Sequence, residues 1–180
     1  DICKALNYLH NEALLIHGDI KSFNILIKGD FAVCKLCDFG VSIRIKKDGL
    51  IDFDKNPAAM YTGTDLWSAP EVFEEDEALI STKSEIFSFG LVLYETITLC
   101  PPHTLEMAAV KKSLNFDDIE KEDDDEEDET DYMVGTRPLF PDDILSTLTE
   151  DYDDILQIFH ICTDDYPEKR PDAAKLERIF

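Results

Sequence analysis

Apolar residues recur every three or four positions in two parts of the chain. Within residues 1–16 they occupy Ile2, Ala5, Leu6, Leu9 and Ala13. A similar stripe near the end of the chain consists of Ile155, Ile158, Phe159 and Cys162. Each spacing predicts a helix with one buried face. Residues 83–99 are apolar nearly all round, which predicts a helix in the middle of the core.

Two shorter apolar runs predict a β-hairpin. Residues 25–27 and 33–37 are rich in strand-forming side chains, and a Lys-Gly-Asp turn signal at 28–30 separates them. Asn24 directly precedes the first run and Asp38 directly follows the second. We therefore expect the hairpin to bring these two polar side chains together, although they are distant in sequence.

The composition is typical of a globular domain with a strong acidic bias. The chain is 44% hydrophobic and has a formal net charge of -23. That charge argues against nucleic acid as a partner, because phosphate binding needs a basic surface. No run reaches the roughly 18 apolar residues of a membrane span, and no basic-then-apolar signal opens the chain.

The cysteines are odd in number and scattered, at Cys3, Cys34, Cys37, Cys100 and Cys162. This pattern favours a reducing compartment over a disulfide framework. Two of them have the C-x-x-C spacing of a redox or zinc pair. A second pair is missing, however, and positions 34 and 37 of a strand point to opposite faces. A metal or redox role is therefore the weaker interpretation.

One segment departs from the rest in composition. Residues 116–131 contain twelve acidic residues and one lysine. Such a run repels itself and is expected to stay solvated and disordered, as an insert within the domain. Its alternative roles are a flexible connection between helices and a docking site for a basic partner.

Residues 17–40 carry the candidate chemistry. They read H-G-D-I-K-S-F-N, then an apolar run, then a second run that ends in D-F-G. Two carboxylates and an amide, Asp19, Asn24 and Asp38, thereby stand at the ends of short apolar segments. Phosphoryl transfer needs such groups, because a carboxylate orients the attacking hydroxyl and oxygen ligands hold magnesium on the phosphates.

H-x-D-x-K-x-x-N, D-F-G and a later A-P-E, in that order, resemble the eukaryotic protein kinases. The resemblance covers nearly the entire chain and implies a protein kinase-like fold, as a mainly α-helical C-lobe with a small β-hairpin. It implies ATP and Mg2+ as cofactors and a protein as substrate. Asp19 would orient the substrate hydroxyl, Lys21 would support the phosphate, and Asn24 with Asp38 would hold magnesium. Cys37 would line the nucleotide pocket.

By the same resemblance, residues 40–71 form the activation segment, which shows loop signals and little periodicity. Its candidate phosphorylation sites are Tyr61, Thr62 and Thr64. The last of these is expected instead to hold Asp19 and Lys21. Many kinases carry an arginine between the His and Asp of the catalytic loop, where this chain has Gly18. Phosphorylation would then act through other basic groups, or the segment is ordered without it.

Three further contacts are implied by the resemblance. Glu71 of A-P-E would pair with Arg170 near the end of the chain. Glu85 would brace the catalytic loop where kinases usually have an aspartate. His17 would pack beneath the D-F-G segment in a structural role.

The resemblance also implies that residues 1–180 are a C-lobe fragment of a kinase domain. Nothing in them matches the glycine-rich phosphate loop, the strand lysine or the helix glutamate of the N-lobe. We therefore expect the N-lobe to be missing from this chain and the fragment alone to be inactive.

Finer features narrow the resemblance. The H-G-D-I-K-S-x-N loop, the K-G-D-F turn, and an acidic insert before G-T-R-P are similar to the PDZ-binding kinase family. This similarity implies a serine/threonine or dual-specificity kinase that resembles mitogen-activated protein kinase kinases. It also implies a link to mitosis and a location in cytoplasm or nucleus. PDZ binding is not implied, because Arg178 stands where such tails carry Ser or Thr. The alternative is a non-catalytic scaffold or truncated product that binds partners through the C-lobe and acidic insert.

Overall fold

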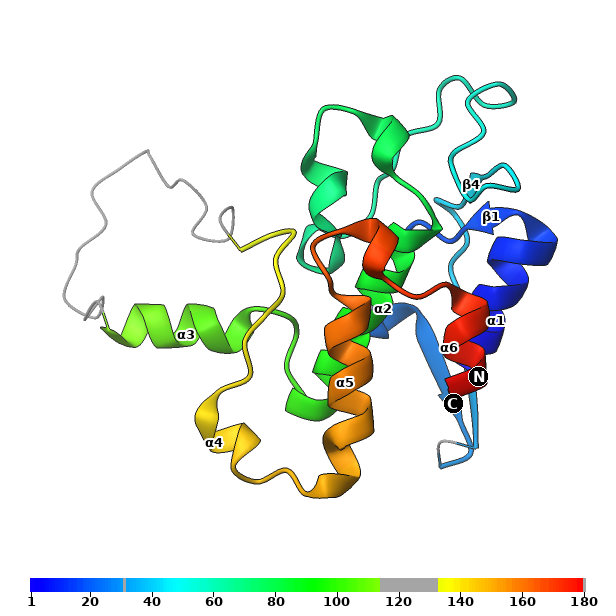
Figure 1. Cartoon of the computed structure of the whole chain (residues 1–180). Coiled ribbons are helices and arrows are strands. Elements are labelled where there is room, and N and C mark those ends of the chain that lie inside the picture. Colours follow the sequence, from blue (N-terminus) through cyan, green and yellow to red (C-terminus); the bar gives the residue numbers. More distant parts are fainter. Residues whose placement is uncertain (31, 114–132, 180) are drawn as a thin grey trace.

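A computed structural model describes residues 1–30, 32–113 and 133–179. The predicted acidic insert, residues 116–131, lies outside the described residues. The two ends of the chain lie side by side (Figure 1). There, α1 (Ile2–Tyr8) packs on α6 (Ala173–Ile179), and the Asn7 amide donates a 2.6 Å hydrogen bond to Glu177.

The predicted central helix is confirmed as α2 (Thr82–Thr98). Its first turn is closed by a capping box, in which the Ser81 hydroxyl accepts from the Lys83 amide and the Ser84 hydroxyl accepts from the Ser81 amide. Nearly all of its first thirteen residues are buried. A helix without a polar stripe is stable only when neighbours surround it, and α2 accordingly lies at the centre of the fold.

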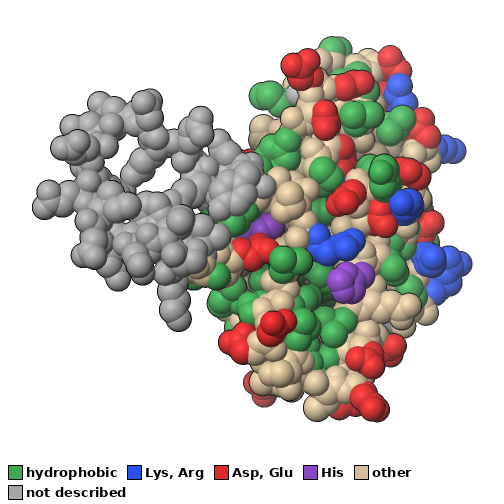
Figure 2. Space-filling model, turned by 60° about the vertical axis from the view of Figure 1, so that its left-hand side comes forward, with side chains coloured by type: hydrophobic (Ala, Val, Ile, Leu, Met, Phe, Trp, Pro, Cys, Tyr) green, Lys and Arg blue, Asp and Glu red, His purple; other side chains and the backbone are tan. Residues whose placement is uncertain are grey.

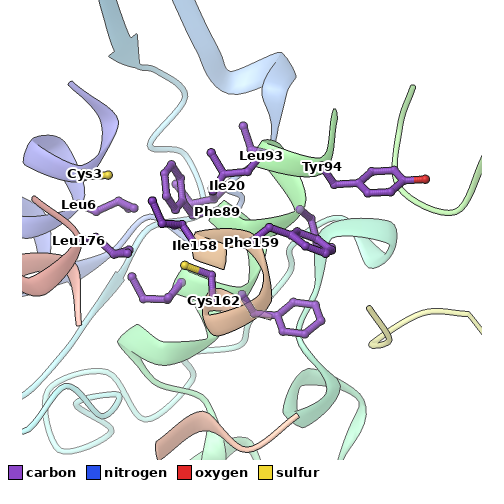
Figure 3. Close-up of a cluster of buried hydrophobic side chains, with 14 of the residues drawn as sticks. Cys3, Leu6, Ile20, Phe89, Leu93, Tyr94, Ile158, Phe159, Cys162 and Leu176 are labelled. Atoms are coloured by element: carbon purple, nitrogen blue, oxygen red, sulfur yellow. The ribbon is translucent and has the colours of Figure 1, made fainter. Parts of the chain in front are cut away.

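The main core forms where α1, α5 (Asp153–Cys162) and α6 pack around α2. Figure 3 shows the side chains that meet there: Cys3, Leu6, Ile20, Phe89, Leu93, Tyr94, Ile158, Phe159, Cys162 and Leu176. The apolar stripes predicted at both ends of the chain thus face the same core. Burying such side chains is the main favourable term in folding.

The first predicted helix is shorter than expected. Regular α-helix ends at Tyr8, a π-helical turn covers Leu9–Ala13, and Leu14 adopts a left-handed backbone with φ 53°. Leu15–Ile16 then form strand β1 instead of helix. The reason is tertiary, because β1 pairs with β4 (Ile43–Arg44), a contact that helix periodicity cannot indicate.

Two small antiparallel sheets hold the two loops that carry Asp19, Asn24 and Asp38. The predicted hairpin is confirmed, with β2 (Ile25–Lys28) and β3 (Val33–Leu36) in the register Ile25↔Leu36. The second sheet pairs β1 with β4. Residues 17–24 connect β1 to β2, and residues 37–42 connect β3 to β4. Each of these two loops therefore runs from one sheet to the other.

The remaining elements are short or peripheral. Helix α3 (Thr104–Ser113) extends away from the other helices, and α4 (Asp142–Leu145) lies below α3 in Figure 1. Six 3₁₀ helices join the described segments: Ser22–Asn24, Asp65–Trp67, Pro70–Phe73, Glu77–Leu79, Glu150–Tyr152 and Pro167–Lys169. In the described part of the chain, every helix is too short or too polar to cross a membrane.

The surface follows the acidic composition. The chain has 40 Asp and Glu against 17 Lys and Arg. Figure 2 shows acidic side chains scattered over the visible face among hydrophobic ones, with few basic groups between them. A surface of this kind attracts cations more than anions.

Candidate active site

The two loops of the candidate site are fastened to each other by His17, which is fully buried. The His17 Nδ1 accepts from the Asp19 amide at 3.3 Å, so Nε2 carries the proton and donates to the Cys37 carbonyl at 2.9 Å. The Ser42 hydroxyl donates to the His17 carbonyl. The ring also lies 4.8 Å from that of Phe39. The predicted packing of His17 beneath D-F-G is thus present.

Asp19 is the centre of a hydrogen-bond network. Its Oδ1 accepts from the Thr64 hydroxyl at 2.7 Å. Its Oδ2 lies 2.8 Å from the Lys21 ammonium and accepts from the Asn24 amide at 2.9 Å. The Lys21 ammonium also donates to the Thr64 hydroxyl at 2.7 Å. Two sequence-predicted residues of the catalytic loop, Lys21 and Asn24, and one of the activation segment, Thr64, therefore converge on the Asp19 carboxylate.

The network keeps Asp19 ionised. Burial raises the pKa of its carboxyl, but the hydrogen bonds from its three partners and the charge of Lys21 outweigh burial and hold that pKa below its ordinary value. An ionised carboxylate accepts hydrogen bonds and cannot donate one. Because Thr64 occupies one acceptor position of Oδ1, a second remains for a substrate hydroxyl.

Asn24 and Asp38 lie at facing ends of the hairpin. The Cys37 amide donates to the Asn24 carbonyl at 3.0 Å, so the pairing of β2 with β3 continues to the residue before Asp38. Among the described residues, both hydrogen bonds that the Asn24 side chain makes use its nitrogen. Its oxygen is therefore free to act as a ligand, while Asp38 is exposed and turns the chain with φ 62°.

This donor set fits Mg2+ bound together with nucleotide phosphates. In the described ranges 1–30, 32–113 and 133–179, no three His, Cys, Asp or Glu side chains converge on a metal position. Mg2+ in phosphoryl-transfer sites commonly takes one or two protein oxygens and completes its shell with phosphates and water. The Asn24 and Asp38 oxygens meet that requirement. The half-buried Cys37 sulfur lies 3.4 Å from the Asn24 carbonyl, beside this position.

Glu85 braces the catalytic loop from α2. One of its oxygens accepts from the Gly18 amide at 2.8 Å, and the other shares a 2.7 Å hydrogen bond with His10 Nε2. Glu85 is fully buried and His10 is nearly so. The role of Glu85 was expected, but that of His10 was missed. Its signal was a polar residue on the buried stripe of the first helix, where a partner is required.

A second carboxylate of α2 holds the other end of the same loop. Glu95 accepts from the Ser22 hydroxyl and from the Trp67 indole, each at 2.7 Å. Burial raises the pKa of Glu95, and these hydrogen bonds partly offset that rise. Sequence reasoning missed Glu95, although an acid within a nearly all-apolar helix indicates a buried partner. Through Glu85 and Glu95, α2 fixes both ends of the catalytic loop.

The activation segment is more structured than a loop. It forms β4, then the isolated pairings Ile45↔Ile51 and Leu50↔Ser81. A second hydrophobic cluster, separate from the main core, is formed largely by this segment: Ile16, Ile43, Ile45, Ile51, Ala59 and Ile80. Apolar burial holds residues 43–59 against β1 and the start of α2.

Gly18 also excludes the arginine that many kinases use. Its φ is 88°, and a Cβ there would lie 2.6 Å from the Val41 carbonyl oxygen. A side chain at this position would strain the backbone and displace Val41, which directly follows D-F-G. The apolar cluster, whose packing involves no phosphate, supports the second of the two hypotheses, in which the activation segment is ordered without phosphorylation.

The three hydroxyls predicted as phosphorylation sites differ in environment. Thr64 is engaged by Asp19 and Lys21. Tyr61 packs in the second hydrophobic cluster, and burial of its hydroxyl raises the pKa of the phenol. Thr62 is exposed. Of the three, Thr62 offers the most accessible hydroxyl in this conformation.

The expected pair of Glu71 and Arg170 is present and buried. The guanidinium binds both carboxylate oxygens, at 2.7 and 2.9 Å, and the two side chains are 6% and 0% exposed. Arg170 also donates to the carbonyls of Asp164, Lys83 and Asp165. The pair joins the end of the activation segment to the segment before α6.

Comparisons with known proteins agree with this geometry. A family model described as the protein kinase domain matches residues 1–178. The chain belongs to the protein kinase domain family. The lymphokine-activated killer T-cell-originated protein kinase of Homo sapiens is 38% identical over 179 residues, or 98% of this kinase chain and 52% of that protein. The resemblance read from the motifs is thus confirmed.

Other relatives are more distant or shorter in overlap. The probable serine/threonine-protein kinase drkC of Dictyostelium discoideum is 41% identical over 104 residues, 57% of the chain and 13% of that protein. Guanylyl cyclase C of Rattus norvegicus is 27% identical over 98% of the chain and 14% of that protein. The kinase chain therefore spans about half the length of the human relative and much less of the others. The predicted absence of an N-lobe stays a prediction.

Proposed function

We propose that this protein transfers the γ-phosphate of ATP to serine or threonine hydroxyls of protein substrates. The observation that carries the proposal is the Asp19 network, in which Lys21, Asn24 and Thr64 all contact one ionised carboxylate. Such convergence is what a phosphoryl-transfer site needs, because catalysis there consists of positioning and charge stabilisation.

The roles follow from the contacts. Asp19 accepts a hydrogen bond from the substrate hydroxyl, orients its oxygen toward the γ-phosphorus, and receives the proton as the new P–O bond forms and the bond to ADP breaks. Lys21, fixed by Asp19 and Thr64, neutralises charge on the transferred phosphate. Asn24 and Asp38 would hold magnesium, which neutralises the phosphate charge and positions it.

The experiment is phosphate transfer from radiolabelled ATP by the full-length protein to a mixture of acceptor proteins, with and without EDTA. Magnesium-dependent label on serine or threonine is expected, and a matched Asn24→Ala variant should lose it while remaining folded. Binding of Mg-ATP without any transfer would contradict the proposal.

The finer class is also proposed. The catalytic-loop sequence, the K-G-D-F turn and the acidic insert support a mitogen-activated protein kinase kinase-like enzyme linked to mitosis, acting in cytoplasm or nucleus. Peptides that differ only in a serine, threonine or tyrosine acceptor test dual specificity. Microscopy of the tagged protein through the cell cycle tests location and timing.

A second candidate function is a non-catalytic scaffold. One observation favours it, because Gly18 replaces the arginine that many kinases carry in the catalytic loop. As a scaffold, the protein would bind a basic partner through the acidic insert. Intact Asp19, Lys21, Asn24 and Asp38 weigh against it, because a scaffold does not need them. Cellular rescue by an Asp19→Asn variant would favour the scaffold over the kinase.

A further inference from the structure

Phe23 is an exposed aromatic residue inside the catalytic loop. Its side chain is 73% exposed, although it sits between two anchored residues. On one side the Ser22 hydroxyl donates to Glu95 at 2.7 Å, and on the other the Asn24 amide donates to Asp19 at 2.9 Å. The backbone at Phe23 is thus fixed while its ring faces outward.

The ring is supported from one side. It packs edge-on against the Trp67 indole, with centroids 6.3 Å apart and planes at 84°. Trp67 is itself buried and donates to Glu95 at 2.7 Å, so the same carboxylate anchors both Ser22 and the indole. An edge-to-face contact of this kind is favourable and directional. Phe23 therefore presents a pre-oriented apolar surface.

This surface lies next to the reacting groups. Consecutive Cα atoms are about 3.8 Å apart, which places the backbone of Phe23 within about 4 Å of that of Asn24 and about 8 Å of that of Lys21. Both of those side chains contact Asp19. A polypeptide whose hydroxyl rests on Asp19 thus passes within side-chain reach of Phe23.

We propose that Phe23, supported by Trp67, binds a large apolar side chain of the protein substrate close to the phosphorylated residue. This rests on the proposed kinase function and specifies its substrate class. The acidic surface alone would favour basic substrates. Phe23 adds a local requirement for a leucine-like or aromatic side chain, because covering its ring removes apolar surface from water.

The size of the effect follows from the area available. A buried aromatic side chain covers about 150–250 Å2. A substrate side chain that covers roughly 60 Å2 of the exposed ring, at about 25 cal/mol per Å2, gives about a tenfold gain in kcat/KM. The gain should appear mainly in KM, since the contact is present in both the bound substrate and the transition state.

The test uses the full-length protein and a set of serine peptides in which one leucine is moved through the positions around the serine, with an all-alanine parent. The wild type should favour one leucine position over the parent by about tenfold in kcat/KM. Phe23→Ser should reduce this ratio below about twofold, and Phe23→Leu should keep most of it. Tyr152→Ser is the matched control at another exposed aromatic residue and should leave the ratio unchanged.

The outcomes separate the two claims. No preferred leucine position in the wild type, or a preference that persists in Phe23→Ser, would overturn the role of Phe23 while leaving the kinase intact. Failure of the wild type to phosphorylate any peptide or protein acceptor would overturn the kinase function and this inference with it. Thermal unfolding midpoints of the Phe23 variants, and retention of the ratio by Phe23→Leu, separate substrate recognition from loss of fold.

Discussion

Replacing Arg170 by methionine should strongly destabilise the kinase chain. The substitution roughly preserves the length of the side chain but removes all its hydrogen-bond donors. Glu71, 6% exposed, would lose both guanidinium contacts and keep the Ser84 hydroxyl as its partner at 2.7 Å. The carbonyls of Asp164 and Lys83 would lose theirs as well.

The magnitude follows from stranding a buried charge. Breaking a buried ion pair by removing one partner costs about 3–5 kcal/mol, because the remaining charge is left uncompensated. The new methionine retains part of the contact that the guanidinium makes over the Phe87 ring at 4.9 Å, so the lower half of that range is expected. For a domain of this size the loss corresponds to a fall in Tm of about 6–15 °C.

The assay is urea unfolding of the full-length protein followed by tryptophan fluorescence, to which the buried Trp67, the single tryptophan of these 180 residues, contributes. Lys169→Met is the matched control, since this lysine is exposed and contacts the Tyr166 ring, and it should change stability by less than about 0.5 kcal/mol. Adding Glu71→Gln to Arg170→Met should recover at least about 1 kcal/mol. An Arg170→Met protein within about 1 kcal/mol of the wild type would refute the reasoning.

Three further predictions concern the loop, the catalytic carboxylate and the thiols. Ile51 is 3% exposed, so Ile51→Ala should open the activation segment to proteolysis and reduce activity, whereas Leu50→Ala, at a residue 42% exposed, should do neither. Phosphatase treatment of the wild type should leave its activity unchanged. Lys21→Met removes the charge that lowers the pKa of Asp19, so the acid limb of the kcat/KM profile should move to higher pH; an unmoved limb would show that another group titrates there. The ionised Asp19 contributes stability above its unfolded pKa and loses it as pH falls through the lower folded pKa. Burial raises the pKa of the Cys162 thiol to about 12, and a thiol reagent at pH 8 should label, in the native protein, only the half-buried cysteines Cys34, Cys37 and Cys100.

Much of the fold was predictable because its signals are local. The stripe of α5, the all-apolar α2 and the turn between β2 and β3 each depend on residues within one segment. The catalytic loop was predictable for the same reason, since Asp19, Lys21 and Asn24 lie within six residues of each other. Strand register then brings Cys37, the residue before Asp38, next to Asn24.

The contacts that sequence did not indicate are those made between distant segments. His10 meets Glu85 across 75 positions, and β1 with β4 are two-residue strands too short to show any periodicity. The activation segment was expected to be a loop because its apolar residues follow no single period. They become a cluster only when residues 43–59 lie against Ile16 and Ile80.

The most direct test of the central claim is the single-turnover rate of phosphate transfer by an Asp19→Asn variant of the full-length protein at saturating Mg-ATP. Asparagine is nearly the same size but carries no charge to receive the hydroxyl proton. The rate should fall by about 10²–10⁴-fold while Mg-ATP affinity stays within about threefold of the wild type. A rate within about tenfold of the wild type would contradict the assignment of Asp19 as the residue that orients the substrate hydroxyl.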